Sequence, residues 1–375
     1  MAADAPHTYY EFFAGGGMAR CGLGDSWRCL FANDFEAKKA ESYAANWGSD
    51  HLHVGDVWKI EPSDLSGRAD LAWASSPCQD LSLAGKRAGL DGGRSSAFWG
   101  FWRLVEALNR EGRPPRSIVI ENVSGLLTSH DGADFTALCE ALAREGYRFG
   151  ALEIDASLFL PQSRPRLFVL ATRGEIPAGL TSGPALPFHG GKVEAAYQRL
   201  PEPLKARWQW WRLDPPERRN ANLADLLEPD TAVDWHEPEE TGRLMALLGP
   251  VHLNKLAAAK AEGGRQVAAL YRRTRAGVQR AELRFDGLAG CLRTPGGGSS
   301  RQFLVIVEGE KVRTRVISPR EGARLMGLPD DYRLPRRAGA ALHLVGDGVA
   351  APVVRRLAEG LLQPLARDAA LLAAE

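Results

Sequence analysis

The stretch Thr8-Tyr-Tyr-Glu-Phe-Phe-Ala-Gly-Gly-Gly17 is a β-rich apolar run that ends in three glycines and leads into a helical pattern. The run predicts a strand over residues 8–13. Glycines after a strand let backbone amides approach a ligand at a helix N-terminus. So short a glycine cluster is about as typical of a tight strand-to-helix turn or of an unrelated nucleotide site. The stretch therefore indicates an α/β fold but does not by itself indicate a function.

The same alternation of short β-rich runs and helical patterns continues along the first half of the chain. It predicts a parallel sheet with helices on both faces. The further strands are expected at Cys29 to Asn33, Leu71 to Ala74, Ser117 to Ile120 and Leu167 to Ala171. Helices are expected at Ala37 to Asn46, Phe98 to Asn109 and Phe135 to Arg144, where apolar residues recur at helical spacing.

The amino-acid composition limits which classes of protein the chain can belong to. A chain of 375 residues with 45% hydrophobic and 25% charged residues suffices for one large domain and a smaller one. The first seven residues hold no basic and apolar leader, and no apolar run is long enough to cross a bilayer. The five cysteines form no Cys-x-x-Cys pair, which argues against a disulfide framework and a structural zinc site. We expect a soluble cytoplasmic protein without a metal ion.

The regular alternation is lost near Gly174, where prolines and glycines punctuate the chain. We therefore predict a first domain over residues 1–174, a second, irregular domain over 175–316 and a C-terminal segment over 317–375. Ser318-Pro-Arg-Glu321 is a capping box that opens a short helix. A last helix near Ala351 to Leu362 suggests that the C-terminus returns to complete the first domain.

Charge is distributed unevenly along the second domain. The net charge of the chain is only +1, so a nucleic-acid partner has to be sought locally. Residues 225–240 hold seven acids and no Lys or Arg, whereas residues 243–284 hold nine bases and two acids. A charge run taken alone is more typical of a solvated helical face. A tryptophan cluster at Trp208, Trp210 and Trp211 precedes these runs and is expected to form a hydrophobic core.

Three polar motifs fall at predicted strand ends. Ser75-Ser-Pro-Cys-Gln79 follows one strand and enters a glycine-rich loop, where a thiol is more typical of function than of a core. Glu121-Asn-Val123 ends the next strand, at the edge where α/β sheets keep their sites. Gln162-Ser-Arg-Pro-Arg166 precedes the strand at Leu167. Taken separately, the acid and the arginines are as typical of surface ion pairs.

In this order, the glycine-rich turn and the three motifs resemble the bacterial DNA (cytosine-5) methyltransferases. The resemblance extends to Arg293-Thr-Pro-Gly-Gly, to Ser318 through Pro329 and to Gly346-Asp-Gly-Val349. It implies a Rossmann-like sheet that binds S-adenosylmethionine, plus a smaller target-recognition domain in the unmatched interval, roughly Glu175 to Leu288. The activity implied is transfer of a methyl group to carbon 5 of a flipped cytosine in a specific duplex sequence.

The resemblance also implies residue roles. Cys78 would be the covalent nucleophile and Glu121 would grip the cytosine ring, while Arg164 would contact the base oxygen and Arg166 would support the site. Phe13 would stack on adenine, Asp34 would hold the ribose and Asp56 the adenine edge. The remaining expected cofactor contacts are Ala14, Gly15, Gly17, Phe35, Val57, Pro77 and Asp347. The residues expected to contact DNA are Gln79, Ser82, Lys86, Arg94, Arg272, Arg273 and Arg275.

Two positions depart from the family pattern. Met18 stands where many relatives have another glycine, and Asp347 where many have asparagine. Because a carboxylate accepts hydrogen bonds but does not donate them, Asp347 puts in doubt the bond normally made near the methionine end of the cofactor.

The sequence leaves three other functions open. The scaffold also serves RNA cytosine methyltransferases, but the chain lacks the Cys-Phe-Thr segment of that group. A non-catalytic DNA-binding protein that senses the cofactor would not need Cys78, Glu121 and Arg164 together. A nicotinamide-dependent oxidoreductase would leave the Pro-Cys-Gln and Glu-Asn-Val motifs unexplained. We expect a monomer that binds double-stranded DNA in the nucleoid, and the sequence leaves open whether a restriction endonuclease accompanies it.

Overall fold

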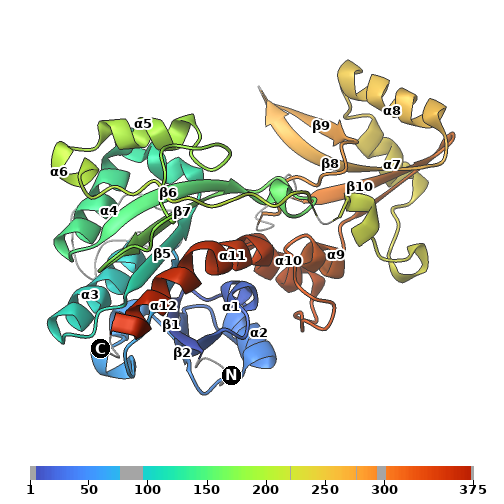
Figure 1. Ribbon diagram of the computed structural model, residues 1–375. Coiled ribbons are helices and arrows are strands. Elements are labelled where there is room, and N and C mark those ends of the chain that lie inside the picture. The colour runs from blue at the N-terminus through green and yellow to red at the C-terminus, as the bar shows by residue number, and fades with distance from the viewer. Residues whose placement is uncertain (1–5, 77–95, 220, 276, 294–300, 373–375) are drawn as a thin grey trace. The chain divides into compact units, whose positions relative to one another are not determined.

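The computed structural model describes residues 6–76, 96–219, 221–275, 277–293 and 301–372. The chain forms two compact units (Figure 1). Unit 1 comprises Met1–Ile154, Pro165–Pro215 and Val353–Glu375, and unit 2 comprises Asp155–Arg164 and Pro216–Pro352. Within the described residues, no helix has both the length and the apolar character needed to cross a membrane.

Unit 1 is built on a seven-stranded sheet with the strand order β3-β2-β1-β4-β5-β7-β6. Strands β1 to β5 pair in parallel, as predicted. The strands are β1 (His7–Phe12), β2 (Trp27–Asp34), β3 (Leu52–Val54), β4 (Leu71–Ser75), β5 (Ser117–Asn122), β6 (Arg148–Asp155) and β7 (Pro165–Thr172). All five strands predicted from sequence are present, with ends that differ by at most two residues.

The last strands depart from the expected parallel arrangement. β7 runs antiparallel to β5, with Glu121 opposite Phe168 and Asn122 opposite Leu167. The reason is β6, a strand that the sequence did not predict. β6 follows α4 and precedes β7, and its interior Gly150 and Glu153 interrupt the apolar alternation that marks a strand. The consequence is that β7 begins beside the end of β5.

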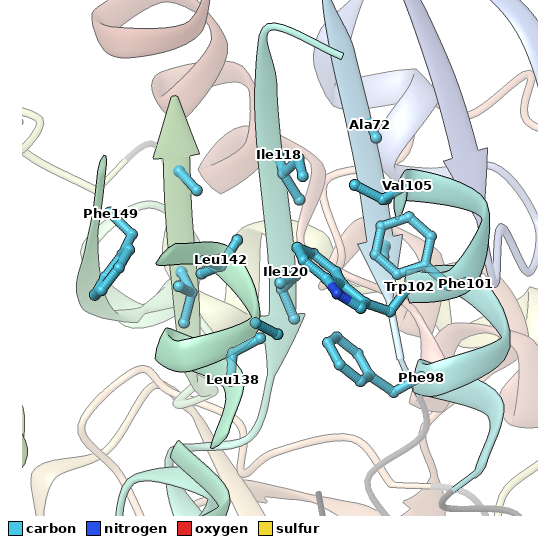
Figure 2. Packing of buried hydrophobic residues seen from close by; sticks show 14 of the residues in the cluster. Ala72, Phe98, Phe101, Trp102, Val105, Ile118, Ile120, Leu138, Leu142 and Phe149 are labelled. Carbon is cyan, nitrogen blue, oxygen red and sulfur yellow. The ribbon is translucent and has the colours of Figure 1, made fainter. Parts of the chain in front are cut away.

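The core of unit 1 lies between the sheet and the helices α3 (Ser96–Arg110) and α4 (Ala133–Arg144). Trp102 of α3 lies beside Ile120 of β5 (Figure 2), and Phe101 packs on Phe12 of β1 with the ring centres 4.8 Å apart. Side chains on the opposite face of the same strands are also buried. At most 1% of the surface is exposed in Tyr9, Trp73, Val119 and Phe168. Both faces of the sheet are therefore covered, as predicted.

The other helices of unit 1 are shorter or come from the chain's end. They are α1 (Met18–Leu23), α2 (Ala37–Trp47), α5 (Gly191–Arg199), α6 (Glu202–Lys205), α11 (Ala351–Leu357) and α12 (Gln363–Leu372). The terminal segment is attached to the rest of unit 1 by polar contacts. Arg116 Nε donates to the carbonyl of Leu365 at 2.7 Å, and Arg356 Nε donates to the carbonyl of Asp214 at 2.7 Å.

The glycine- and proline-rich segment after Gly174 lies within Pro165–Pro215 of unit 1. Trp208 packs against Phe149 and Phe135, and Trp211 Nε1 donates to the carbonyl of Leu170 at 3.0 Å. Trp208 and Trp211 are buried, which confirms the prediction that the tryptophan cluster forms a core. The chain crosses into unit 2 at Pro216 and returns at Val353.

Unit 2 contains a four-stranded antiparallel sheet with the order β11-β10-β8-β9, so it is more regular than expected. The strands are β8 (Arg265–Arg275), β9 (Val278–Arg284), β10 (Gln302–Glu308) and β11 (Lys311–Val316). One face packs on the segment of α7 (Pro238–Met245) and on α8 (Pro250–Glu262), through Leu244, Leu256, Leu270 and Leu283. The unit ends with α9 (Pro319–Arg324) and α10 (Ala338–Asp347).

A buried ion pair joins β11 to α9. Both guanidinium Nη atoms of Arg315 donate to the Glu321 carboxylate at 2.6 Å, and these side chains are 1% and 2% exposed. Glu321 also accepts from the amide of Glu228 at 2.9 Å and from that of Ser318 at 3.0 Å, completing the predicted capping box. The Glu321 carboxylate therefore has its countercharge and two further donors, as a buried charge requires.

Arg315→Ala should lower the free energy of unfolding by about 3–5 kcal/mol, because it leaves the Glu321 carboxylate buried without its countercharge. The matched control is Arg284→Ala, which breaks the bidentate but more exposed pair with Asp286 and should cost about 1 kcal/mol or less. Urea denaturation of the purified variants measures both. Equal losses would show that burial does not set the strength of the Arg315 pair.

Candidate active site

The loop after β1 has an unusual backbone. Phe13, Gly15 and Gly17 lie in the left-handed region, with φ of 58°, 56° and 77°. For a non-glycine residue such as Phe13 this conformation costs on the order of 1–3 kcal/mol, and such strain is concentrated at binding sites. Gly17 also has a steric requirement, because a Cβ there would lie 2.6 Å from Trp47 Cδ1. The loop conformation therefore requires glycine at position 17.

Asp34, at the end of β2, fastens this loop. Its carboxylate accepts from the amide of Gly15 at 2.7 Å and from the amide of Glu36 at 2.8 Å. The residue is 7% exposed, and burial raises the pKa of its carboxyl, although the two amide bonds oppose that shift. Each carboxylate oxygen has a second lone pair, so Asp34 retains the capacity to accept further donors.

The surroundings of Asp34 suit a nucleoside. A Cβ built on Gly15 would meet nothing within 4 Å, so space is open beside the loop. Phe35 follows Asp34 directly and its side chain is 75% exposed, which is unusual for so large an apolar group. Open space, an apolar ring and a carboxylate are the features that an adenosine moiety requires. These residues therefore fit the S-adenosylmethionine expected from sequence.

The other expected cofactor contacts on this side have structural roles as well. Asp56 caps the 3₁₀ turn Val57–Lys59, since its Oδ1 accepts from the amide of Trp58 at 3.0 Å. The Val57 side chain is 4% exposed and belongs to the core, so a ligand would meet its backbone. Ala14 is also buried, and its amide donates to the carbonyl of Asn33 at 2.9 Å.

The ends of β4 and β5 lie side by side. Ser75 is the register partner of Glu121, and Asn122 Nδ2 donates to Ser76 Oγ at 3.0 Å. Ser75 and Ser76, which lead into the Pro-Cys-Gln motif, therefore lie beside the Glu-Asn-Val motif. Pro77, Cys78, Gln79, Ser82, Lys86 and Arg94 themselves lie outside the described residues.

Glu121 is paired with the second arginine of the Gln-x-Arg-x-Arg motif. Arg166 Nε lies 3.3 Å from Glu121 Oε1, and the two side chains are 18% and 10% exposed. This contact depends on the antiparallel direction of β7, which brings its first residues to the end of β5. A parallel β7 would have begun at the opposite edge of the sheet.

Arg164, expected at the base oxygen, has a different set of neighbours. It is 2% exposed and its guanidinium donates to the carbonyls of Leu292 at 2.7 Å, Gly346 at 2.9 Å and Gly348 at 2.6 Å. All of these residues belong to unit 2. Arg164 thus joins chain segments within that unit, and it is Arg166 that contacts Glu121.

Gln162 has a comparable role that the sequence did not reveal. It is fully buried, donates to the carbonyl of Leu325 at 2.6 Å and accepts from the amide of Leu292 at 3.0 Å. Gln162 shares Leu292 with Arg164, and Arg164 alone binds the residues on either side of Asp347, which ends α10 and lies 3.8 Å from His343 Nε2. The only signal in the sequence was the motif itself, because these partners are more than 120 residues away.

A buried polar group beneath the glycine loop was also missed. Glu11 of β1 is 1% exposed, and burial raises the pKa of its carboxyl to about 8, while the nearby Arg20 opposes that shift. Arg20 Nη1 donates to Tyr43 Oη at 3.1 Å and contacts His51 Nε2. These residues connect β1, α1 and α2 underneath the loop. Among the described residues, no group of three or more His, Cys, Asp or Glu is arranged to hold a metal ion.

The arginines expected to contact DNA are divided between the two faces of the unit 2 sheet. Arg272 lies opposite Ala281, on the face that packs against the helices, and its guanidinium is 5.2 Å from the centre of the Phe303 ring. Arg273 lies opposite Arg280 and therefore points to the other face. The side chain of Arg275 lies outside the described residues.

A comparison with protein-family models matches residues 7–363 to the C-5 cytosine-specific DNA methylases. The chain belongs to this family. The match includes both units, so the enzyme carries the family's pattern along nearly its whole described length. The family generally uses S-adenosylmethionine, in agreement with the features around Asp34.

Relatives and solved structures agree with this assignment. The enzyme is 24% identical over 377 residues to the type II methyltransferase M.HpaII of Haemophilus parainfluenzae, covering 96% of this chain and 90% of that one. It is 33% identical to M.BsuFI of Bacillus subtilis over 165 residues, 44% of this chain and 38% of that one. The crystal structure of Dnmt2 from S. pombe shares the fold, with a TM-score of 0.61 and 19% identity over 96% of this chain and 99% of that one.

Asp34→Ala should raise the dissociation constant for S-adenosylmethionine at least tenfold, or about 1.4 kcal/mol, because the carboxylate both shapes the loop and would accept ribose hydroxyls. Asp34→Asn keeps one acceptor oxygen and should give a smaller loss. Asp25→Ala, an exposed acid in the loop before β2, is the control. Isothermal titration calorimetry measures all three. Wild-type affinity in Asp34→Ala would exclude Asp34 from the cofactor site.

Proposed function

We propose that the enzyme transfers the methyl group of S-adenosylmethionine to carbon 5 of a flipped cytosine in a specific duplex DNA sequence, through a covalent adduct with Cys78. The observation that carries the proposal is the Glu121–Arg166 pair beside Ser75 and Ser76, the residues that lead into the Pro-Cys-Gln motif. This edge of the sheet combines an acid, a fixed cation and the entry to a thiol-bearing segment.

The chemistry explains why those groups are needed together. Carbon 5 of cytosine is too weak a nucleophile to attack a methyl group directly. Addition of the Cys78 thiolate to carbon 6 makes carbon 5 electron-rich, and S-adenosylmethionine would supply an electrophilic sulfonium methyl. Removal of the carbon 5 proton by a base then allows the carbon 6–sulfur bond to break and returns the thiolate.

Glu121 would stabilise the activated base and Arg166 would orient Glu121. A carboxyl at N3 of the cytosine stabilises the ring once the thiolate has added. The Arg166 guanidinium orients that carboxyl, and a cation near the thiol would favour its ionised form. The target base must leave the helix to reach these groups, at a cost of a few kcal/mol.

Arg164 is proposed to act indirectly. Its buried guanidinium holds the carbonyls of Gly346 and Gly348, which flank Asp347. We therefore assign Arg164 to positioning Asp347 and not to the base oxygen, and assign Arg166 to the base side of the site. Unit 2 would supply target recognition.

Cys78→Ala should reduce methyl transfer to background while leaving cofactor affinity nearly unchanged, because the thiol acts on the base. The measurement is transfer of a labelled methyl group from S-adenosylmethionine to DNA, together with calorimetry. Cys21→Ala, a half-buried thiol of α1, is the control and should retain activity. Duplex DNA with 5-fluorocytosine at the target should trap the wild-type enzyme covalently, because fluorine does not leave as a proton does. Turnover by Cys78→Ala, or an adduct on another residue, would exclude the assigned nucleophile.

Glu121→Gln should lower the turnover number by about 100- to 1,000-fold with little change in DNA affinity, because the charge-assisted contact matters most after the ring becomes electron-rich. Single-turnover kinetics and a binding titration separate the two effects. Glu153→Gln on β6, whose carboxylate lies 3.5 Å from Lys192 Nζ, is the matched control and should behave as wild type. An unchanged turnover number in Glu121→Gln would remove that residue from the mechanism.

A further inference from the structure

The β8–β9 hairpin extends beyond the sheet of unit 2. β10 pairs with β8 only as far as Tyr271, whereas β9 continues to pair with β8 as far as Arg275. Within the described residues, four residues of each strand, 272–275 and 278–281, therefore form a two-stranded ribbon past the edge of β10. At about 3.3 Å per residue the ribbon is about 13 Å long.

The ribbon is strongly basic. Residues 272–281 contain four arginines and no acid. Cross-strand partners point to the same face, and successive residues alternate between faces. Arg272 shares the helix-covered face with Ala281, whereas Arg273 and Arg280 lie directly opposite each other on the other face.

The Arg273 and Arg280 arrangement is costly in the isolated protein. Like charges directly opposite on a sheet destabilise it. Arg273 is partly compensated, since its Nε lies 3.6 Å from Glu282 Oε2 and its guanidinium packs 4.9 Å from the centre of the Tyr271 ring. Its side chain nevertheless remains 52% exposed, and Arg280 is exposed too. Two arginines held side by side in this way are suited to an external polyanion.

We propose that the β8–β9 ribbon enters the major groove of duplex DNA and that Arg273 and Arg280 recognise guanine edges there. The major groove admits a two-stranded ribbon and is about 8.5 Å deep, less than the ribbon's length. Arginine binds the O6 and N7 acceptors of guanine in a bidentate manner. The major groove of duplex RNA is too deep and narrow for such contacts, so the ribbon favours DNA as the substrate. The inference rests on the proposed function, because it takes duplex DNA as the substrate.

Bisulfite sequencing of DNA from cells that express the full-length enzyme identifies the methylated sequence directly. Arg273→Ala and Arg280→Ala should each relax the preference for guanine at one position, with at least a tenfold loss of discrimination in binding to duplexes altered there. Arg243→Ala removes the same charge from an exposed position on α7 of the same unit. This control should keep the wild-type preference, and thermal unfolding checks that all three variants fold.

The outcomes distinguish failure of this inference from failure of the proposed function. If wild-type enzyme methylates no DNA cytosine, the proposed function fails, and this inference fails with it. If it methylates a defined sequence that Arg273→Ala and Arg280→Ala leave unchanged, only the ribbon inference is overturned. A uniform loss of affinity for all sequences, with a salt slope reduced by about one, would mean phosphate contact and would also overturn base recognition. Equal dependence of duplex RNA binding on these arginines would exclude the major-groove mode.

Discussion

The parallel pairing of β1, β2, β4 and β5 is the constraint on which the site depends. Parallel strands bring their carboxyl ends to one edge of a sheet, whatever their separation in sequence. The loop at Phe13, the carboxylate of Asp34, and the Ser75 and Glu121 register pair all follow such strand ends. Two buried faces hold the strands in register, because a slip of one residue would move each core side chain to the other packed face and disrupt the packing on both.

Much of unit 1 could be predicted because its signals are local. Each of the five predicted strands is a short β-rich run, and Gly15 and Gly17 after β1 occupy left-handed positions that glycine adopts most easily. The motifs at Glu121 and Arg166 were found for the same reason. Their contact was not predictable, because it depends on the direction of β7 and so on β6, whose alternation is interrupted by Gly150 and Glu153.

The roles within the Gln-x-Arg-x-Arg motif show where sequence reasoning ends. Arg164 and Arg166 are two residues apart and chemically identical, yet one is buried among carbonyls of unit 2 and the other is paired with Glu121. Arg164 is the last residue of a segment of unit 2, whereas Arg166 lies in the segment of unit 1 that begins at Pro165, so the two arginines have different neighbours. The two side chains are identical, so nothing in them predicts which arginine lies in which unit. The same limit applies to Arg272 and Arg273, whose faces were fixed only by the register of β8 with β9.

Unit 1 is assembled from three separate stretches of chain, and unit 2 is inserted between them. The hydrogen bond from Arg116 to the carbonyl of Leu365 joins residues 249 positions apart. During synthesis on the ribosome, β1, β2, β4 and β5 are therefore complete long before Leu365, the partner of Arg116, has been added. All residues of unit 2 have been synthesised once Pro352 has been added. Unit 2 can therefore fold while the Val353–Glu375 stretch of unit 1 is still to be synthesised. The order of synthesis thus allows the inserted unit to fold before the unit that contains it is complete.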